Sequence, residues 1–456
     1  MKGPKFGTSG LRGLVTDLSD ALVARYAAGF ADYLQHRGRV LIGRDLRESS
    51  PRIARAVAAG LRAAGAVPVD CGALPTPALA FESARRAHPA IMVTGSHIPA
   101  DRNGLKFYTA QGEISKDDET GIQFACAARG AAWLDGETSV EDDALAAFRA
   151  RYTTAFTGLP LTGMRIGVYQ HSSVARDLLV DILSDLGAHV MPLGRSEKFV
   201  PVDTEAVSPK AAALLQSWAQ GFDAIVSTDG DADRPMVADE NGRVIPGDVL
   251  GPLTAREIGA KTIVTPVSSN SLVEKMGAFD RVVRTRIGSP FVIAAMKAEG
   301  AHAVAGYEAN GGFLLGFATS GLAPLMTRDC VLPIIVPLIA SARRGLSLSA
   351  LRETLPPIFT ASDRLQDVDP ERSKSLIAGL SPGSDLAGQV FAGFGKETAR
   401  DMTDGLRVTF EKSLVVHIRP SGNAPELRCY AEAQSQDAAT ALVARTLAGL
   451  RQKLSG

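Results

Sequence analysis

Cysteine is scarce in this sequence, whose 456 residues include only Cys71, Cys126, Cys330 and Cys429. These four lie far apart without a Cys-x-x-Cys pair, which argues against a zinc site or a disulfide framework. An excess of charge is also missing, because 49 lysines and arginines balance 49 aspartates and glutamates. We therefore expect neither a nucleic-acid partner nor a membrane-binding surface.

Long apolar runs are absent as well. The most apolar segment, residues 330–342, is short and contains two prolines, which predicts a buried core segment and not a membrane span. Residues 1–6 lack the apolar stretch of a signal peptide. Together with cysteines that we expect to be reduced, these features predict a cytoplasmic protein.

The chain is too long for one hydrophobic core and contains a repeated pattern. Strand-like segments that run into a polar turn, a helix and a second strand begin at residues 39, 164 and 261. A further buried strand follows each time and ends in an unusual loop. We interpret the pattern as three copies of one α/β domain, each delivering a loop from an equivalent strand end.

The C-terminal part breaks this pattern and predicts a smaller domain of strands and helices, with a final amphipathic helix over residues 438–453. The predicted fold class is α/β: three similar α/β domains with mixed, mainly parallel sheets, plus a smaller C-terminal α+β domain, around a central cleft. The predicted domain boundaries are 1–155, 156–255, 256–366 and 367–456.

The first loop presents a serine. The apolar residues 90–93 run directly into Thr94, Gly95, Ser96 and His97, and Lys106 follows a short way on. A hydroxyl group at the carboxyl end of a buried strand lies where open α/β sheets bind their ligands. A plain polar turn explains these residues, taken alone, equally well.

The second loop carries three alternating aspartates, Asp229, Asp231 and Asp233. Their carboxylates can converge on one hard cation, for which we expect Mg²⁺ because positions remain for waters and a phosphate oxygen. The alternative is a solvated acidic turn. Three like charges this close repel one another unless a cation neutralises them, which favours the metal site.

The third loop places Glu308 and Asn310 between glycines. They offer an acceptor and a combined donor and acceptor on an open backbone, which suits the vicinal hydroxyl groups of a sugar. A glycine-rich turn with incidental polar residues is nearly as good an interpretation.

The fourth loop is rich in hydrogen-bond donors and is predicted to bind phosphate through Arg419, Ser421, Gly422, Asn423 and Arg428. Glycine lets backbone N–H groups approach an anion, and arginine can bind it through two hydrogen bonds. A plain hairpin turn would explain the glycine and the asparagine, but not the arginine and serine beside them. Together, the four loops could move a phosphoryl group between Ser96 and a sugar phosphate that is held by its other end.

These motifs resemble those of the α-D-phosphohexomutases, a family that includes phosphomannomutases, phosphoglucomutases and phosphoglucosamine mutases. The similarity covers essentially the whole chain, in order. The matching segments are the N-terminal motif, the phosphoserine loop, the metal loop, the sugar loop and the phosphate loop, at residues 6–13, 94–99, 229–234, 306–312 and 419–425. Within the family, residues 94–108 and 306–313 look most like bacterial phosphomannomutases of surface-polysaccharide and GDP-mannose pathways.

The resemblance implies roles for particular residues. Ser96 would carry the phosphoryl group, with His97 beside it in the catalytic site. Its phosphoserine oxygen and the three aspartates would bind Mg²⁺. Arg12 and Arg234 would stabilise the transferring group, Lys106 would assist proton transfer, and Glu308 would bind sugar hydroxyls.

The implied reaction interconverts mannose 1-phosphate and mannose 6-phosphate through a hexose 1,6-bisphosphate, which also serves as activator. The implied partner is a phosphorylated hexose, bound by a monomer or homodimer. Phosphoglucosamine mutase or phosphoglucomutase activity is the alternative within the family. A catalytically silent sugar-phosphate-binding protein is the alternative of another class.

Three positions depart from the family's pattern. Ile98 stands where many members have asparagine, so a hydrogen bond of the loop is lost or replaced. Gly312 and Ser289 stand where histidines occur in other members. The identity of the general base therefore remains open.

Overall fold

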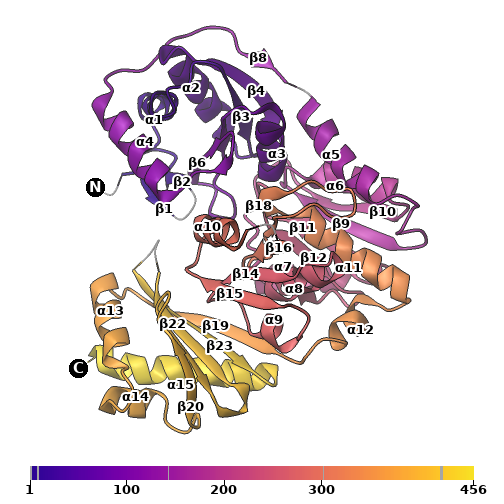
Figure 1. The fold of residues 1–456 in the computed structure, drawn as a ribbon, viewed down its shortest axis with the longest axis vertical. Helices are drawn as coiled ribbons and strands as arrows, with labels where there is room; N and C mark the ends of the chain where they lie inside the picture. The colour runs from indigo at the N-terminus through magenta and orange to yellow at the C-terminus, as the bar shows by residue number, and fades with distance from the viewer. Residues whose placement is uncertain (1–2, 8–9, 142, 301, 422–424, 456) are drawn as a thin grey trace.

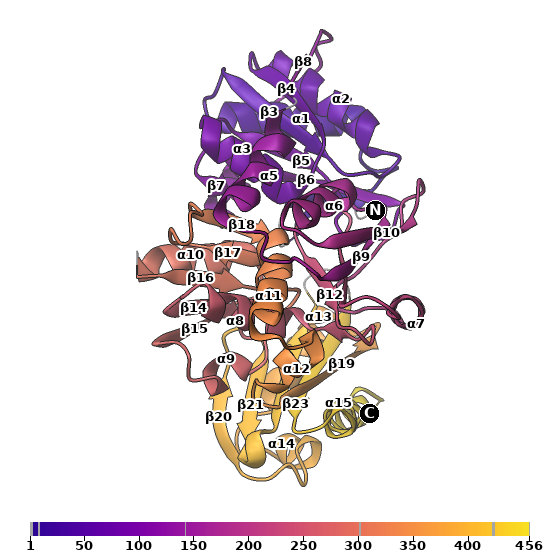
Figure 2. The same cartoon turned by 90° about the vertical axis from the view of Figure 1, so that its right-hand side faces the viewer.

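The computed structural model describes residues 3–7, 10–141, 143–300, 302–421 and 425–455. They form four β-sheets that follow one another along the chain, each accompanied by helices. Figures 1 and 2 show the N-terminal domain at the top, the second and third domains in the middle and the C-terminal domain at the bottom. The predicted fold class, three α/β domains and a smaller α+β domain, is confirmed.

The first domain contains an eight-stranded sheet, in which the order is β1-β2-β6-β5-β3-β4-β8 and β7 pairs with β6. Strands β5, β3 and β4 run parallel, and the strands from β5 to β1 alternate in direction. The strand bounds are β1 (Lys5–Gly7), β2 (Gly10–Leu14), β3 (Arg39–Arg44), β4 (Val67–Ala73), β5 (Ala90–Val93), β6 (Arg102–Thr109), β7 (Gly112–Glu113) and β8 (Ser139–Val140). The helices are α1 (Asp20–Tyr33), α2 (Ser50–Ala63), α3 (Thr76–Arg86), α4 (Lys116–Ala128) and α5 (Asp143–Ala155).

The second and third sheets share one topology, β10-β9-β11-β12-β13 and β15-β14-β16-β17-β18. The first three strands of each are parallel and the last two antiparallel, as expected for repeated units. Their strands are β9 (Arg165–His171), β10 (His189–Arg195), β11 (Ala224–Thr228), β12 (Pro235–Ala238), β13 (Val244–Ile245), β14 (Thr262–Pro266), β15 (Arg281–Thr285), β16 (Val304–Tyr307), β17 (Phe313–Leu315) and β18 (Leu325–Asp329). The helices are α6 (Arg176–Asp185), α7 (Pro209–Trp218), α8 (Gly247–Glu257), α9 (Leu272–Lys275), α10 (Ser289–Glu299), α11 (Val331–Arg344) and α12 (Leu348–Glu353).

One hydrophobic core joins the first three domains. It includes Met92 of β5, Val226 of β11 and Phe313 of β17, together with most of the buried face of α11. Helix α11 corresponds to the apolar segment at 330–342 and lies near the middle of the molecule (Figure 2), so the prediction of a buried core segment is confirmed. None of the helices within the described ranges combines the length and the hydropathy of a membrane span.

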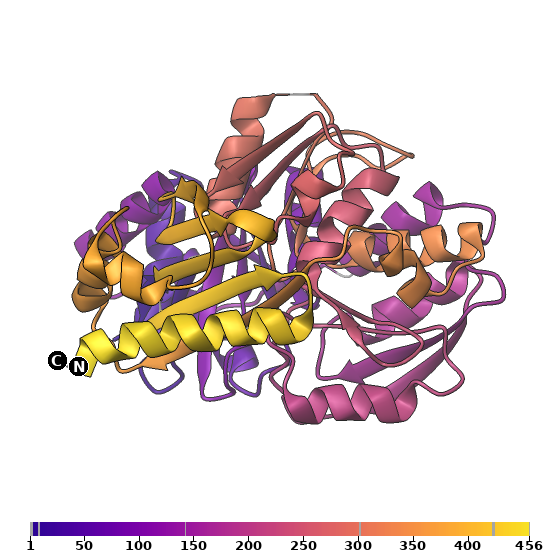
Figure 3. The same cartoon turned by 90° about the horizontal axis from the view of Figure 1, so that it is seen from below.

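The fourth sheet is antiparallel throughout, in the order β19-β23-β22-β21-β20. Its elements are β19 (Phe359–Gln366), α13 (Pro370–Gly379), α14 (Asp385–Val390), β20 (Glu397–Asp401), β21 (Leu406–Phe410), a 3₁₀ turn (Glu411–Ser413), β22 (Val415–Pro420), β23 (Glu426–Ala433) and α15 (Gln436–Ser455). The long helix α15 lies along the sheet (Figure 3), and the domain has a hydrophobic core of its own. Strand β19 pairs with β23 over its whole length, although the predicted boundary after residue 366 placed it in the third domain. An isolated strand pattern does not reveal its partner strand.

Polar contacts tie the fourth domain to the third. The Glu432 carboxylate accepts hydrogen bonds from the backbone N–H and the hydroxyl of Ser271, at 3.0 and 2.5 Å, and pairs with Arg407. The Asp404 carboxylate accepts from the backbone N–H of Ile287 at 3.0 Å. Hydrogen bonds therefore hold the fourth domain against the third.

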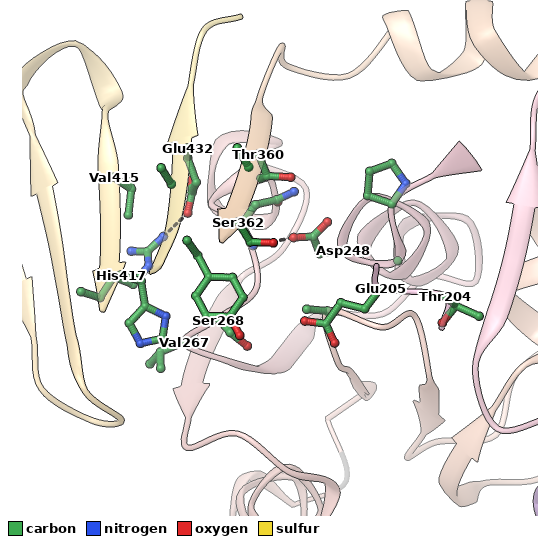
Figure 4. Close-up of a pocket in the computed structure, with 18 residues that line it drawn as sticks. Thr204, Glu205, Asp248, Val267, Ser268, Thr360, Ser362, Val415, His417 and Glu432 are labelled. Carbon is green, nitrogen blue, oxygen red and sulfur yellow. Dashed lines mark hydrogen bonds and ion pairs between the residues drawn. The ribbon is translucent and has the colours of Figure 1, made fainter. Parts of the chain in front are cut away.

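A cavity of about 170 Å³ lies beside these contacts, between the fourth domain and the two middle ones. Figure 4 shows His417 and Glu432 on the side of the fourth domain, facing Asp248 and Glu205 on the opposite side. Asp248 is buried, and its Oδ2 accepts one hydrogen bond from the backbone N–H of Asn270 at 3.0 Å. Burial raises the pKa of Asp248 to about 7.

This raised pKa predicts a pH-dependent stability. The folded state binds the Asp248 proton more tightly than the unfolded chain does, so the stabilisation is lost as the pH rises from about 4 through about 7. The asparagine side chain of an Asp248→Asn variant cannot ionise. Between about pH 5 and pH 8, the wild-type protein should lose roughly 2 to 3 kcal/mol of unfolding free energy relative to this variant. Thermal unfolding at a series of pH values measures this difference.

The control is Asp143→Asn, at an exposed carboxylate in the first turn of α5. Its stability should follow that of the wild type at every pH. A constant difference between the wild type and Asp248→Asn across the range would contradict the prediction.

Candidate active site

Ser96 lies in the loop that follows β5, with its side chain buried. Its backbone has a φ of 53°, in the left-handed region that non-glycine residues seldom adopt. The backbone N–H donates to the Thr94 hydroxyl at 2.8 Å, and the Ser96 hydroxyl donates to Oδ2 of Asp229 at 2.6 Å. The loop therefore directs the Ser96 hydroxyl at the aspartate cluster.

Arg47 fixes the backbone of this loop. Its guanidinium group is buried, pairs with Asp45 at 3.1 Å and donates to four backbone carbonyl oxygens, those of Ser96, Ile98, Pro99 and Arg102. A Cβ atom at Gly95 would lie 2.5 Å from the Arg47 Cζ atom, so the close approach requires glycine. The loop is thus fixed through its backbone, including the carbonyl group of Ile98.

The three aspartates follow β11 on a tight loop. Each carboxylate offers an oxygen atom, and these atoms lie within 4.8 Å of one another. All three side chains are buried. Lys106 donates to Oδ2 of Asp231 and to Oδ2 of Asp233, each at 2.6 Å. The cluster of the second domain therefore meets both the serine loop and Lys106 of the first.

The cluster fits a divalent cation. Among the described residues, the buried Oδ1 atoms of Asp231 and Asp233 have no hydrogen-bond partner, a costly arrangement unless a ligand supplies one. Burial and repulsion by its two neighbours raise the pKa of Asp229 well above its ordinary value. Burial would raise the pKa of Asp231 too, but the Lys106 ammonium group reverses the shift and lowers it. Hard carboxylate oxygens of this kind suit Mg²⁺.

A cleft of about 380 Å³ opens beside the cluster and is lined by all four domains. One residue from each of the four predicted loops, His97, Arg234, Glu308 and Arg419, is therefore found in the lining of one cleft. The predicted site residues among its lining are Arg12, His97, Arg234, Glu308, Asn310, Arg419, Ser421 and Arg428. Gly422 and Asn423, also predicted to bind phosphate, lie outside the described residues.

Positive charge dominates one side of the cleft. Arg12, Arg234 and Arg328 line it together, and burial and the charge of Arg234 lower the pKa of Arg12 to about 10. Burial and the charges of Arg234 and Arg12 lower the pKa of His97 well below its usual range. The His97 Nδ1 atom lies 3.3 Å from the Ser96 hydroxyl. Such a cleft attracts anionic ligands.

Some predicted residues have local partners. The Asn310 side-chain oxygen accepts from the Gly312 backbone at 3.0 Å and so shapes its own loop. Arg419 lies 3.4 Å from an oxygen of Asp404, and Arg428 lies 3.2 Å from one of Glu426. Lys106 lies between two aspartates and, like Ser96 and the three aspartates of the cluster, is not among the residues that line the cleft.

Two arginines were not predicted. Arg328, at the end of β18, places Nη2 2.7 Å from Oδ2 of Asp233 and Nη1 3.2 Å from Oε2 of Glu308. Its signal in the sequence is weak: a charged pair, Arg328 and Asp329, immediately before the apolar segment at 330. Arg47 carries no signal that separates it from the other arginines, because its partners are backbone atoms.

Four known domain models match this chain in order. The four domain models described as phosphoglucomutase/phosphomannomutase domains I, II, III and the C-terminal domain match residues 3–130, 148–242, 246–359 and 383–448. The chain belongs to the phosphoglucomutase/phosphomannomutase family. It is an enzyme of the mutase class.

Phosphomannomutases from Sinorhizobium fredii (strain NGR234) and Salmonella muenchen are 48% and 45% identical to this chain. Each alignment covers 99% of the chain, and they cover 100% and 96% of the two relatives, respectively. A crystal structure of a phosphoglucomutase/phosphomannomutase family protein from Burkholderia thailandensis has a TM-score of 0.78 at 23% identity, covering 98% of this chain and 96% of that one. That structure has the same fold.

The aspartate cluster can be tested with a metal ion alone. Replacing Asp231 by asparagine removes a charged ligand from a buried set of three, so Mn²⁺ affinity should fall about 100-fold. Titration calorimetry, or the spin-resonance signal of free Mn²⁺, measures it without any sugar.

Asp203→Asn provides the matched control, because Asp203 lines the cleft but does not belong to the cluster. Its Mn²⁺ affinity should stay within about threefold of the wild-type value. Equal losses in the two variants would mean that general negative charge, and not the cluster, attracts the ion.

Proposed function

We propose that this protein is a phosphomannomutase that interconverts mannose 1-phosphate and mannose 6-phosphate. Its intermediate would be a hexose 1,6-bisphosphate, which also serves as activator, and its product would supply GDP-mannose and surface-polysaccharide synthesis. The protein would act in the cytoplasm as a monomer or homodimer. Two phosphomannomutases, 48% and 45% identical over nearly the whole chain, support the choice of sugar.

The observation that carries the proposal is the meeting of four loops at one cleft. The Ser96 hydroxyl lies 2.6 Å from Asp229 and 3.3 Å from Nδ1 of His97, and His97 lines the same cleft as Arg419, Ser421 and Arg428. A sugar phosphate held there by its phosphate group would direct its opposite end toward Ser96. A binding protein has no need of a buried hydroxyl beside a carboxylate cluster.

The reaction has two transfers. In the first, the bond between phosphorus and Ser96 Oγ breaks as phosphorus bonds to the free hydroxyl oxygen of the sugar monophosphate; that hydroxyl gives its proton to a base, and Ser96 Oγ takes up a proton. In the second, Ser96 Oγ loses its proton as it bonds to the other phosphorus of the bisphosphate, and the sugar oxygen that leaves takes up a proton. The sum is an isomerisation that leaves Ser96 phosphorylated.

Residues on the cleft wall support these steps. Arg12 and Arg234 would stabilise the negative charge on the transferring phosphoryl group. A Mg²⁺ ion held by Asp229, Asp231, Asp233 and the phosphoserine would supply further positive charge for that group. Lys106, which donates to Asp231 and Asp233, would assist proton transfer. Glu308 would bind sugar hydroxyl groups.

The substrate is tested by supplying the purified protein with Mg²⁺, a trace of hexose 1,6-bisphosphate and each sugar phosphate in turn. We expect the highest kcat/KM with mannose 1-phosphate. Higher values with glucose or glucosamine phosphates would assign one of the other two mutase activities. Absence of turnover of the mannose compound would overturn the proposal.

The covalent mechanism is tested by Ser96→Ala. This variant should lose at least about 10³-fold in kcat because it has no phosphoryl acceptor, while its unfolding temperature stays close to that of the wild type. Mass spectrometry of the wild-type protein after incubation with hexose bisphosphate should find phosphate on Ser96. Unphosphorylated wild-type Ser96 under these conditions would favour a non-catalytic binding protein.

A further inference from the structure

Arg328 connects two of the functional loops. It stands at the end of β18 in the third domain, 3% exposed, and lines the cleft. One nitrogen, Nη2, lies 2.7 Å from Oδ2 of Asp233 in the second domain. The other, Nη1, lies 3.2 Å from Oε2 of Glu308. One rigid guanidinium group therefore spans the metal loop and the sugar loop.

The contact to Glu308 leaves one of its carboxylate oxygens available. The Oε2 atom of Glu308 accepts a hydrogen bond from Arg328. Within the part of the chain that the structure describes, no hydrogen bond is formed to Oε1, and Glu308 lines the cleft. A carboxylate that is free to rotate would offer either oxygen in many directions. Arg328 restricts Glu308 to a single oriented acceptor, which is the requirement for distinguishing one sugar hydroxyl configuration from another.

The position of Arg328 depends on Gly312. A Cβ atom at Gly312 would lie 2.8 Å from both Cγ and Cδ of Arg328 and 3.0 Å from its Cβ. Such distances are shorter than van der Waals contact, and they involve the base of the Arg328 side chain as well as its flexible part. The absence of a side chain at 312 therefore gives the Arg328 stem its path to Glu308.

We propose that Arg328, accommodated by Gly312, is a positioning residue that sets the sugar specificity of the cleft by orienting Glu308. This inference rests on the proposed reaction of a sugar phosphate, but not on mannose being the preferred sugar. Lysine at 328 would keep the charge but could not form two separate contacts in a fixed geometry. Alanine at 312 would keep the arginine and displace its stem. Both changes should therefore reduce the selectivity between sugars in the same way.

The test measures kcat/KM with the 1-phosphates of mannose, glucose and galactose for the wild type, Arg328→Lys and Gly312→Ala. In both variants, the ratio between the preferred sugar and at least one epimer should fall about tenfold. The change should appear mainly as a higher KM for the preferred sugar. Ratios within twofold of the wild-type values in both variants would overturn the proposal.

A double-mutant cycle tests whether Arg328 acts through Glu308. Glu308→Gln alone should reduce the same ratio, and adding Arg328→Lys should reduce it no further. If the ratio in the double variant falls by the product of the two single-variant factors, the two residues act independently, and the proposed role is overturned. The Mn²⁺ affinity of Arg328→Lys should remain within about threefold of the wild-type value, because Lys106 still contacts Asp233. A tenfold loss of Mn²⁺ affinity would instead assign Arg328 to the metal site.

The control is Arg343→Lys, at an exposed arginine on α11 that pairs with Glu257; neither residue lines the cleft. It should leave every ratio unchanged. If the wild type prefers glucose, the mannose assignment fails while the ratios still test Arg328. If the wild type shows no turnover, calorimetry measures the dissociation constant of each sugar phosphate instead. The ratio of these constants between the preferred sugar and an epimer should then fall about tenfold in both variants, and ratios within twofold of the wild-type values would overturn the proposal.

Discussion

The interaction on which the rest of this structure depends is the pairing of buried charges around Asp233. Its carboxylate belongs to a cluster with Asp229 and Asp231 and is contacted by Lys106 from the first domain and Arg328 from the third. Removing one partner from a buried ion pair commonly costs about 3 to 5 kcal/mol, because the other charge is left uncompensated. The first three domains are thus held in register at the very point where the chemistry is expected.

The shared hydrophobic core also fixes the first three domains relative to one another. Because one core runs through three domains, their sheets cannot shift relative to one another without exposing apolar side chains. The ends of the equivalent strands β5, β11 and β16 consequently face one region. Each of these strands is followed by a loop that carries Ser96, Asp229 or Glu308. Repetition of one unit, packed in this way, turns three separate loops into one site.

Much of this arrangement could be predicted from the sequence. The repeated strand and helix pattern indicates the fold class, and like charges at 229, 231 and 233 indicate a cation site. Contacts that depend on tertiary structure could not be predicted. Arg47 binds backbone carbonyl groups, which leave no trace in the sequence, and Arg328 reaches Glu308 only because β18 pairs with β17. The strand at 359–366 was assigned to the third domain for the same reason, since its partner strand lies much further along the chain.

The fourth domain differs from the others in how it is attached. It has a separate core, and Glu432 and Asp404 join it to the third domain through hydrogen bonds. Water can replace hydrogen bonds of this kind at a small net cost, whereas it cannot replace apolar contacts. Hinge bending at this junction would therefore widen the cleft without disturbing the aspartate cluster. In the reaction that we propose, a bisphosphate could then turn end over end while the aspartate cluster stays in place.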